Sequence, residues 1–252
     1  MISKVEQINA LLKSIETGNP EPVAVVNEDR YVQHNPQTHE GSEGLAKLFA
    51  RLSKTGPKVN MVRGFEDGDF VFAQMEYDFS SRKICFEVFR FEDDQAVEHW
   101  DNIQERQAPN RSGHSMVDGP TEATDLERTE DNRTLVRDFV ETVLLGGQID
   151  KAGNFVAEDF IEHNPQSKDG ITALVDRLDN TKDSPPDIDY QTLYWVLAQG
   201  NFVLSVSEGY RGTDHCAFYD LFRVADGKLV EHWDTTEKIA PRSEWKNENG
   251  KF

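Results

Sequence analysis

The sequence has little of what several protein classes require. Only two of its 252 residues are cysteine, Cys85 and Cys216. Two lone thiols favour a reducing compartment over a disulfide framework. No apolar run approaches the roughly 18 residues that cross a bilayer, and residues 1–7 lack the apolar stretch of a signal peptide. We therefore expect a cytoplasmic protein without a membrane partner.

Positive charge is also scarce. The chain has 27 Lys and Arg residues against 46 Asp and Glu, a formal net charge of −19. On average such a surface repels nucleic acid and anionic membranes. The acidic residues form no concentrated tail, so we interpret the charge as a solubility feature and not as a site for a cationic partner. We expect no nucleic-acid partner.

Motifs of several enzyme classes are missing. There is no Gly-rich phosphate loop, no Gly-x-Ser-x-Gly elbow and no zinc-finger spacing. His34, His99 and Glu87 are the residues for a two-histidine, one-carboxylate metal set, but no HxH or HExxH spacing supports it. The expected cofactor is none, and the expected metal is none.

What the sequence does contain is an internal repeat. The letters HNPQ at 34–37 return at 163–166, an offset of 163 − 34 = 129 residues. The letters EHWD at 98–101 return at 231–234, an offset of 232 − 99 = 133 residues. Chance does not explain two four-residue identities in the same order at nearly one offset. The repeat therefore indicates a duplicated domain.

The repeat sets the expected domain boundaries. Half the chain is about 125 residues, a common size for one domain with its own core. We predict one domain over 1–106 and a second over 129–252. The segment 107–128 is rich in Pro, Gly, Ser, Asp and Thr and has no apolar period, so it is predicted to be an exposed tether.

Each half begins with helical periodicity and continues with strand periodicity. A capping-box pattern at Ser3 to Glu6 opens the first helix, and Gly18-Asn19-Pro20 ends it. Three helices and four antiparallel strands per half predict an α+β fold. The predicted helices cover about 5–15, 21–27 and 45–52, then 135–144, 149–157 and 174–178; the predicted strands cover about 58–65, 70–78, 83–91 and 96–104, then 188–197, 202–210, 215–224 and 229–239.

The third strand of each half carries an acid among large apolar residues. Glu87 alternates in phase with Phe89 and Phe91, and Asp220 with Phe222. An acid in this phase points into a core or an apolar pocket. There it must find a partner or take up a proton, which suits a general base. A structural acid paired with an arginine or a backbone amide is the alternative.

The fourth strand places a histidine and an acid on one face in each half. These pairs are His99 with Asp101 and His232 with Asp234. Together with Glu87 or Asp220 they form an acid–His–acid row. A histidine held by a carboxylate is a proton shuttle near neutral pH. A buried histidine bonded to an acid for stability explains the pattern equally well.

The hairpin loop decides which residues stand opposite one another. A three-residue loop at 225–227 places Asp220 opposite His232, and a two-residue loop at 226–227 places it opposite Trp233. We favour the three-residue loop, because Gly227 then takes the left-handed position of a bulge. In the first half Gln95 is expected where that glycine stands.

His34 and His163 each precede an Asn-Pro pair, which forms turns. One interpretation places each histidine on a turn at the mouth of a cavity. The other has the histidine cap the helix that follows. The sequence alone leaves both open.

The chain resembles the SnoaL-like polyketide cyclase family of the nuclear-transport-factor-2-like fold, most closely its predicted aldol-condensation branch. The resemblance rests on QHNPQTHEG (33–41) with EHNPQSKDG (162–170), and on EVFRFEDDQAVEHWD (87–101) with DLFRVADGKLVEHWD (220–234). It implies a cone-shaped domain, with a curved antiparallel sheet wrapped over helices and a pocket inside. It also implies cofactor-free acid–base chemistry on a carbonyl compound. Glu87 departs from the aspartate expected there, which favours the second half as the active one.

The resemblance further implies pairing of such domains through the open sheet face. That face carries apolar residues in both halves, including Trp100 and Trp233. We therefore expect two tandem domains arranged as an intrachain pseudodimer. The predicted function is a small-molecule enzyme of the isomerase, cyclase or dehydratase type that acts on a small apolar or carbonyl-containing molecule; a non-catalytic binding module or a duplicated scaffold is the alternative. The candidate catalytic residues are Asp220, His232, Asp234, His163, Glu87, His99, Asp101 and His34.

Overall fold

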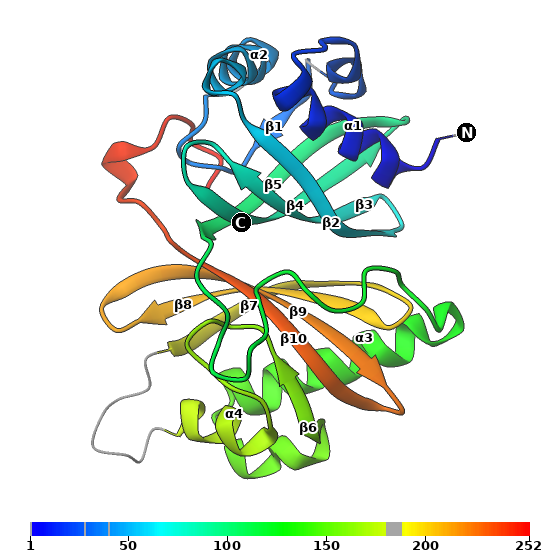
Figure 1. Cartoon of the computed structure of the whole chain (residues 1–252), viewed down its shortest axis with the longest axis vertical. Helices are drawn as coiled ribbons and strands as arrows, with labels where there is room; N and C mark the ends of the chain where they lie inside the picture. Colours follow the sequence, from blue (N-terminus) through cyan, green and yellow to red (C-terminus); the bar gives the residue numbers. More distant parts are fainter. Residues whose placement is uncertain (1, 28, 40, 180–187) are drawn as a thin grey trace. The chain divides into compact units, whose positions relative to one another are not determined.

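The computed structural model describes residues 2–27, 29–39, 41–179 and 188–252. The chain divides into two compact units (Figure 1). Unit 1 comprises Met1–Glu105 together with Ala240–Phe252, and unit 2 comprises Arg106–Ile239. None of the described helices is both long and apolar enough to cross a membrane.

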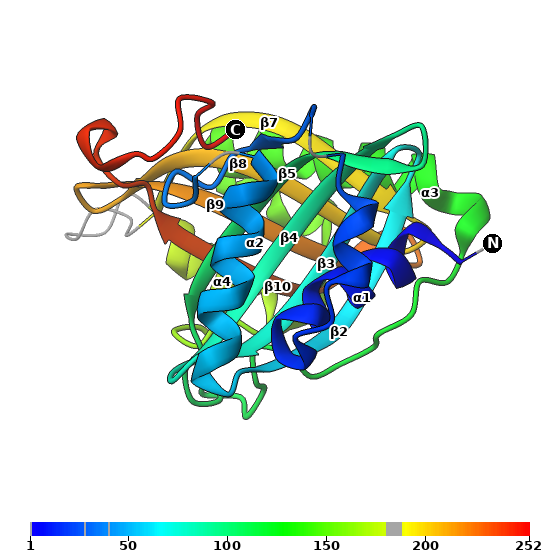
Figure 2. The same ribbon diagram turned by 90° about the horizontal axis from the view of Figure 1, so that it is seen from above.

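Unit 1 is a five-stranded sheet with its helices gathered on one face. The strands stand in the order β1-β5-β4-β3-β2, and α1 and α2 lie across the sheet (Figure 2). The α+β prediction is confirmed for this half. The elements are α1 (Lys4–Thr17), η1 (Glu21–Val25), β1 (Val32–Gln33), α2 (Gly41–Leu52), η2 (Ser53–Thr55), β2 (Lys58–Asp67), β3 (Phe70–Asp78), β4 (Arg82–Glu92) and β5 (Gln95–Glu105).

Local sequence explains how α1 is positioned. Ser3 and Glu6 form the predicted capping box, and Gly18 ends the helix at φ 71°, a left-handed conformation that glycine adopts without strain. Ile8 and Leu11 are fully or almost fully buried against the sheet. Helical periodicity therefore delivers one apolar face of α1 to the core of unit 1.

Unit 2 repeats this order of elements. Its strands stand in the order β6-β10-β9-β8-β7, with α3 and α4 on one face of the sheet (Figure 1). The elements are η3 (Leu126–Arg128), α3 (Thr129–Phe139) with a π-helical continuation η4 (Val140–Leu145), η5 (Ile149–Asn154), β6 (Val156–Glu162), α4 (Ile171–Leu178), β7 (Ile188–Gln199), β8 (Phe202–Arg211), β9 (Asp214–Ala225), β10 (Lys228–Lys238); η6 (Arg242–Glu244) follows in unit 1.

The sequence did not indicate the short strands β1 and β6. The helix predicted to reach residue 157 ends at Asn154, and β6 begins at Val156. Both short strands run parallel to the long fourth strand, with Gln33 paired to His99 and Glu162 paired to His232. Each short strand therefore brings the residue before its HNPQ motif onto the face that carries His99 or His232.

The hairpin loops differ from the one we favoured. In unit 2 the loop has two residues, Asp226 and Gly227, and the register then shifts between Leu229 and Glu231. This bulge places Asp220 opposite Asp234, so neither predicted pairing occurs. Because the bulge restores the alternation, Asp220 and Asp234 still share a face with His232.

Unit 1 repeats this correction. Glu87 stands opposite Asp101, and the register shift lies after Arg90. Asp94, and not Gln95, occupies the position of Gly227, with φ 62°. The predicted acid–His–acid rows therefore exist on one face in both units, through a different register from the one expected.

Most of the segment 107–128 is exposed, as predicted, but the segment is not a free tether, because it belongs to unit 2. Asn110 and Met116 are buried there, and the Asp118 carbonyl accepts a hydrogen bond from Trp233 Nε1 at 2.9 Å. The chain after β10 likewise belongs to unit 1, where Lys251 Nζ donates to the Asp101 carbonyl at 2.7 Å. Individual side-chain and backbone contacts anchor both segments. Neither segment is held by a periodic apolar face.

Candidate functional site

A cavity of about 240 Å³ lies in unit 1, between the sheet and its two helices. Leucine, isoleucine and phenylalanine side chains make about half of its wall. The polar lining residues are Tyr31, Gln33, Asn35, Gln37, Thr38, Arg51, Tyr77, Glu87, His99 and Asp101. A pocket that combines apolar walls with converging polar groups is the usual form of a small-molecule site.

His99 is held from both sides. Its Nε2 lies 2.6 Å from Glu87 Oε2, and its Nδ1 lies 3.0 Å from Gln33 Oε1. The Asn35 backbone N–H donates to the same Gln33 atom at 2.8 Å, which identifies that atom as the amide oxygen. Nδ1 of His99 therefore carries a proton. A second proton lies between Nε2 and Glu87.

Glu87 has a further donor on its other oxygen. The Tyr77 hydroxyl donates to Glu87 Oε1 at 2.6 Å. Burial, and then the nearby Glu87 charge, raise the pKa of Tyr77 well above its usual value, so the phenol keeps its proton. Glu87 is thus fixed by two partners, Tyr77 and His99.

Two other polar atoms of the cavity lining have no hydrogen-bond partner among the described residues. They are the Tyr31 hydroxyl and Asp101 Oδ1, and both are buried. Asp101 Oδ2 accepts from Asn35 Nδ2 at 2.6 Å, while Lys251 Nζ lies 3.5 Å from Oδ1. Burial, followed by Glu87 and Asp101, raises the pKa of Tyr31 well above its usual value. The residues that line the cavity therefore include one phenol hydroxyl and one aspartate oxygen without a hydrogen-bond partner among the described residues.

In unit 2 the matching histidine lies between two carboxylates. His232 Nε2 is 3.0 Å from Asp220 Oδ1, and Nδ1 is 2.8 Å from Glu162 Oε1. Burial alone lowers the pKa of His232, but Glu162 and Asp220 outweigh it and raise the pKa to about 10. Burial likewise opposes ionisation of Glu162, yet His232 and Arg177 hold its pKa at about 2. His232 is therefore a permanent imidazolium near neutral pH.

Three differences at the constant offset of 129 residues separate the two interiors. They remove the phenol hydroxyl, replace an amide by a carboxylate, and add a partly buried guanidinium 4.0 Å from that carboxylate. The matched positions are Tyr31 with Phe160, Gln33 with Glu162, and Leu48 with Arg177. At these positions unit 1 is therefore less charged than unit 2.

The hydroxyl on the strand acid is kept, but from a different strand. Tyr77 of β3 stands opposite Val59, whereas Tyr190 of β7 stands opposite Gly209. The Tyr190 hydroxyl lies 3.2 Å from both Asp220 oxygens. The tyrosine and the small residue have thus exchanged places across the strand pair.

Of the two interpretations left open for His34 and His163, the cavity mouth is not supported for His34, which is not among the residues that line the unit 1 cavity. His34 Nε2 lies 2.9 Å from Glu98, and its ring stacks on Trp100 at 4.7 Å. His163 lies 2.8 Å from Glu231 and stacks on Trp233 in the same way. Strand alternation directs each residue away from the face of its neighbour Gln33 or Glu162.

Metal-ligand geometry differs from the set considered in the sequence. His34 lies on the opposite face from His99 and Glu87, so those three do not converge. Two other groups have ligand atoms within 4.8 Å of one another among the described residues. One is Cys85 with Glu87 and Asp101 in the cavity, where Tyr77, His99 and Asn35 already bind the carboxylates. The other is His114 with Asp118 and His163.

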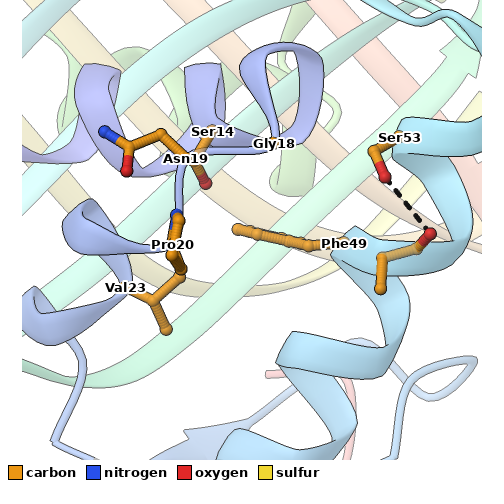
Figure 3. A pocket seen from close by; sticks show the side chains of 8 residues that line it. Ser14, Gly18, Asn19, Pro20, Val23, Phe49 and Ser53 are labelled. Atoms are coloured by element: carbon orange, nitrogen blue, oxygen red, sulfur yellow. Dashed lines mark hydrogen bonds between the residues drawn. The ribbon is translucent and has the colours of Figure 1, made fainter.

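A second hollow of about 230 Å³ lies between the end of α1 and α2 (Figure 3). Phe49 points from α2 toward Pro20 and belongs to the walls of both hollows. The lining includes Ser14 and Ser53 but no titratable side chain. The second hollow therefore lacks the acid–base groups of the first.

Several residues of the two interiors were not identified from the sequence. Gln33 and Glu162 each stand one residue before an HNPQ motif. Recognising the short strands β1 and β6 would have placed both residues beside the histidines of β5 and β10. The others are Tyr31, Asn35, Tyr77, Arg177, Tyr190 and Lys251. Their roles depend on side chains from elements far apart in the sequence.

Comparison with known proteins gives one family match and several similar solved structures. Curated proteins gave no match. An NTF2-like protein of unknown function from Mesorhizobium loti is 17% identical, with a TM-score of 0.38, covering 47% of this chain and 97% of that one. One from Cytophaga hutchinsonii is also 17% identical, with a TM-score of 0.37, covering 47% and 95%.

An M. tuberculosis LEH-like epoxide hydrolase is likewise 17% identical, with a TM-score of 0.35, covering 44% of this chain and 85% of that one. The family described as "SnoaL-like domain" matches residues 136–232, from α3 to His232 of β10. The stretch 136–232 of this chain is a SnoaL-like domain.

Proposed function

We propose that unit 1 is an acid–base active site for a small, largely apolar carbonyl compound. The observation that carries this proposal is the pair of buried atoms in one cavity, the Tyr31 hydroxyl and Asp101 Oδ1, that have no hydrogen-bond partner among the described residues. A buried hydroxyl without a partner costs free energy, and the 3.5 Å ion pair with Lys251 leaves Asp101 Oδ1 without a hydrogen bond, so a ligand that satisfies both atoms gains affinity.

Each group has a role in this chemistry. Asp101 Oδ1 takes a proton from the carbon next to the carbonyl, and Tyr31 donates a hydrogen bond to the carbonyl oxygen as negative charge develops there. The proton between Glu87 and His99 supplies a second transfer group on the same face. Isomerisation, cyclisation and dehydration all begin with this step.

Unit 2 shares only one of the two features that support catalysis in unit 1, since Asp234 Oδ1 also lacks a hydrogen-bond partner among the described residues. Phe160 has no hydroxyl to donate, and His232 is fixed as a cation between Glu162 and Asp220. The SnoaL-like match of unit 2 supports a small-molecule enzyme family for the domain. The proposal thus favours the first half of the chain, where the sequence favoured the second.

Proton exchange tests this function without a known substrate. The full chain is incubated in D2O with ketones that fit about 240 Å³, such as 2-decalone, and loss of the proton signal beside the carbonyl is followed by NMR. Tyr31→Phe should slow the exchange by about 10²-fold, because it removes one carbonyl donor. Phe160→Tyr, at the matched position of unit 2, should leave it unchanged.

Two results would count against this function. Exchange that is equally fast in the wild type and in Tyr31→Phe would contradict the role of the phenol. Saturable binding of the ketones without exchange in any variant would support the alternative of a non-catalytic binding module.

A further inference from the structure

We infer that unit 2 carries a divalent transition-metal site formed by His114, Asp118 and His163. One ligand atom from each lies within 4.8 Å of the other two. His114 and Asp118 come from the segment after β5, and His163 comes from the second HNPQ motif. This site is independent of the proposed chemistry in unit 1.

The surroundings of His163 place oxygen acceptors at both of its ring nitrogens. Nε2 lies 2.8 Å from Glu231 Oε1, while Nδ1 lies 2.7 Å from the Ser115 carbonyl and 2.8 Å from Asp118 Oδ1. All three neighbours are acceptors. A neutral ring that donates from Nε2 would point its Nδ1 lone pair at two oxygens, which is repulsive. A proton or a metal ion at Nδ1 removes this conflict.

Both histidines have the second contact that metal ligands usually have. A ligating histidine typically donates its other ring N–H to a carboxylate, which fixes the tautomer. His163 meets Glu231 in this way, and His114 Nε2 lies 3.0 Å from Asp169 Oδ2. A proton on Nε2 of His163 leaves its Nδ1, which lies 2.8 Å from Asp118 Oδ1, for the ion.

These two carboxylates are themselves fixed. Arg223 Nε donates to Glu231 Oε2 at 2.7 Å. The Glu162 backbone N–H donates to Asp169 Oδ1 at 3.0 Å. The orientation of each histidine is thus determined two contacts away from the proposed ion, as in built metal centres.

The loop that supplies His114 and Asp118 is also held closely. Asn110 Oδ1 accepts from the backbone N–H of Ser112 at 2.9 Å and of His114 at 3.0 Å. Gly119 has φ +95°, and a Cβ there would lie 2.6 Å from Glu231 Oε1. Only glycine lets the loop approach Glu231 so closely. The approach brings the neighbouring Asp118 to His163.

Unit 1 offers an internal comparison. His34 has the same contacts with a glutamate and a tryptophan, Glu98 and Trp100. Among the residues that the structure describes, no group of three ligand atoms forms around His34. The site therefore does not follow from the duplicated motif alone, because it requires the loop residues His114 and Asp118.

The ligand set selects the class of ion. Two imidazole nitrogens and one carboxylate suit Zn²⁺ and its first-row neighbours, whereas Ca²⁺ and Mg²⁺ prefer oxygen ligands alone. Ligand bonds of about 2.0–2.2 Å require some adjustment of Asp118. Its side chain is 48% exposed and has room to move.

Metal titration of the untagged full chain tests the site. After treatment with a chelator, Zn²⁺ is titrated by calorimetry and Co²⁺ by absorbance. We expect one saturable ion per chain, and an affinity at least about 10-fold lower in His114→Gln and in Asp118→Asn, because each removes one ligand. The control is His215→Gln, which changes an exposed histidine that lies 3.0 Å from Glu208 and outside the proposed site, and it should bind like the wild type.

Circular dichroism confirms that each variant is folded. Equal affinity in the wild type, His114→Gln and Asp118→Asn would overturn the proposal, as would the absence of saturable binding. A sulfur-to-cobalt charge-transfer band would also overturn it, because that band would place the ion at Cys85 in unit 1.

Discussion

Gln33 in unit 1 and Glu162 in unit 2 make the same contact with different charge. Gln33 Oε1 lies 3.0 Å from Nδ1 of His99, and Glu162 Oε1 lies 2.8 Å from Nδ1 of His232. In unit 1 the histidine has one carboxylate partner, Glu87. In unit 2 it has two. One amide-to-acid difference thus separates a histidine with one carboxylate partner from a histidine with two.

The pair of Glu162 and His232 predicts a defined pH dependence of stability. The pKa of His232 rises from 6.5 to about 10 in the folded state, so its contribution is complete below pH 6.5 and is lost as the pH rises through 10. The pKa of Glu162 falls from 4.5 to about 2, so its contribution is complete above pH 4.5 and is lost as the pH falls through 2. The pair should stabilise unit 2 most between pH 4.5 and 6.5.

Denaturant unfolding across pH, together with imidazole NMR, checks this dependence. Glu162→Gln should remove the acidic decline and lower the pKa of His232, since its largest stabilising charge is gone. An NMR titration of wild-type His232 centred near its usual 6.5 would refute the assignment.

Arg177 and Glu162 should be energetically coupled. Breaking a buried ion pair from one side costs about 3–5 kcal/mol, and the partial exposure of Arg177 places the expected cost of Glu162→Gln at the lower end. The double variant Glu162→Gln with Arg177→Leu reproduces Gln33 and Leu48 of unit 1. It should recover at least about 1 kcal/mol relative to the sum of the single changes.

Free energies of unfolding for the four proteins complete this cycle. The matched control adds the reverse change Gln33→Glu alone in unit 1. That variant should be destabilised, because Leu48 supplies no positive charge there. Strict additivity of the two unit 2 substitutions would show that the charges act independently.

Gly209 should not tolerate a side chain. A Cβ there would lie 2.0 Å from the Asp189 carbonyl and 3.0 Å from Tyr190 Cα, so β7 would have to move. We expect Gly209→Ala to cost about 1–3 kcal/mol of unfolding free energy. Gly153→Ala is the control, since its Cβ would meet nothing closer than 3.9 Å. Equal stability of the two variants would contradict the close approach of the Asp189 carbonyl to Gly209.

Much of the fold was predictable because its signals are local. The period of two gave the eight long strands to within about two residues, and the capping box and Gly18 gave both ends of α1. The short strands β1 and β6 were missed, because two to seven residues beside a turn give no clear period. The pairing of the two sheets within the chain stays a prediction.

The site was predictable only in part. Face alternation grouped Glu87, His99 and Asp101 correctly, although a bulge at Val97 and not the loop length sets their register. The same alternation, once β1 is known, moves His34 to the opposite face. Tyr31 and Lys251 could not be found, because their contacts with this group depend on the folded chain and not on spacing.

We propose that the cavity of unit 1, and not the interior of unit 2, carries the proton-transfer chemistry. Asp101→Asn and Asp234→Asn test it most directly, because both residues occupy the same position and both accept from an asparagine, at 2.6 and 2.7 Å. Rates of proton exchange beside the carbonyl of the ketone probe are compared in the full chain. We expect the exchange rate to fall by about 10²- to 10⁴-fold in Asp101→Asn and to stay unchanged in Asp234→Asn. The opposite pattern, or an equal rate in both variants, would contradict it.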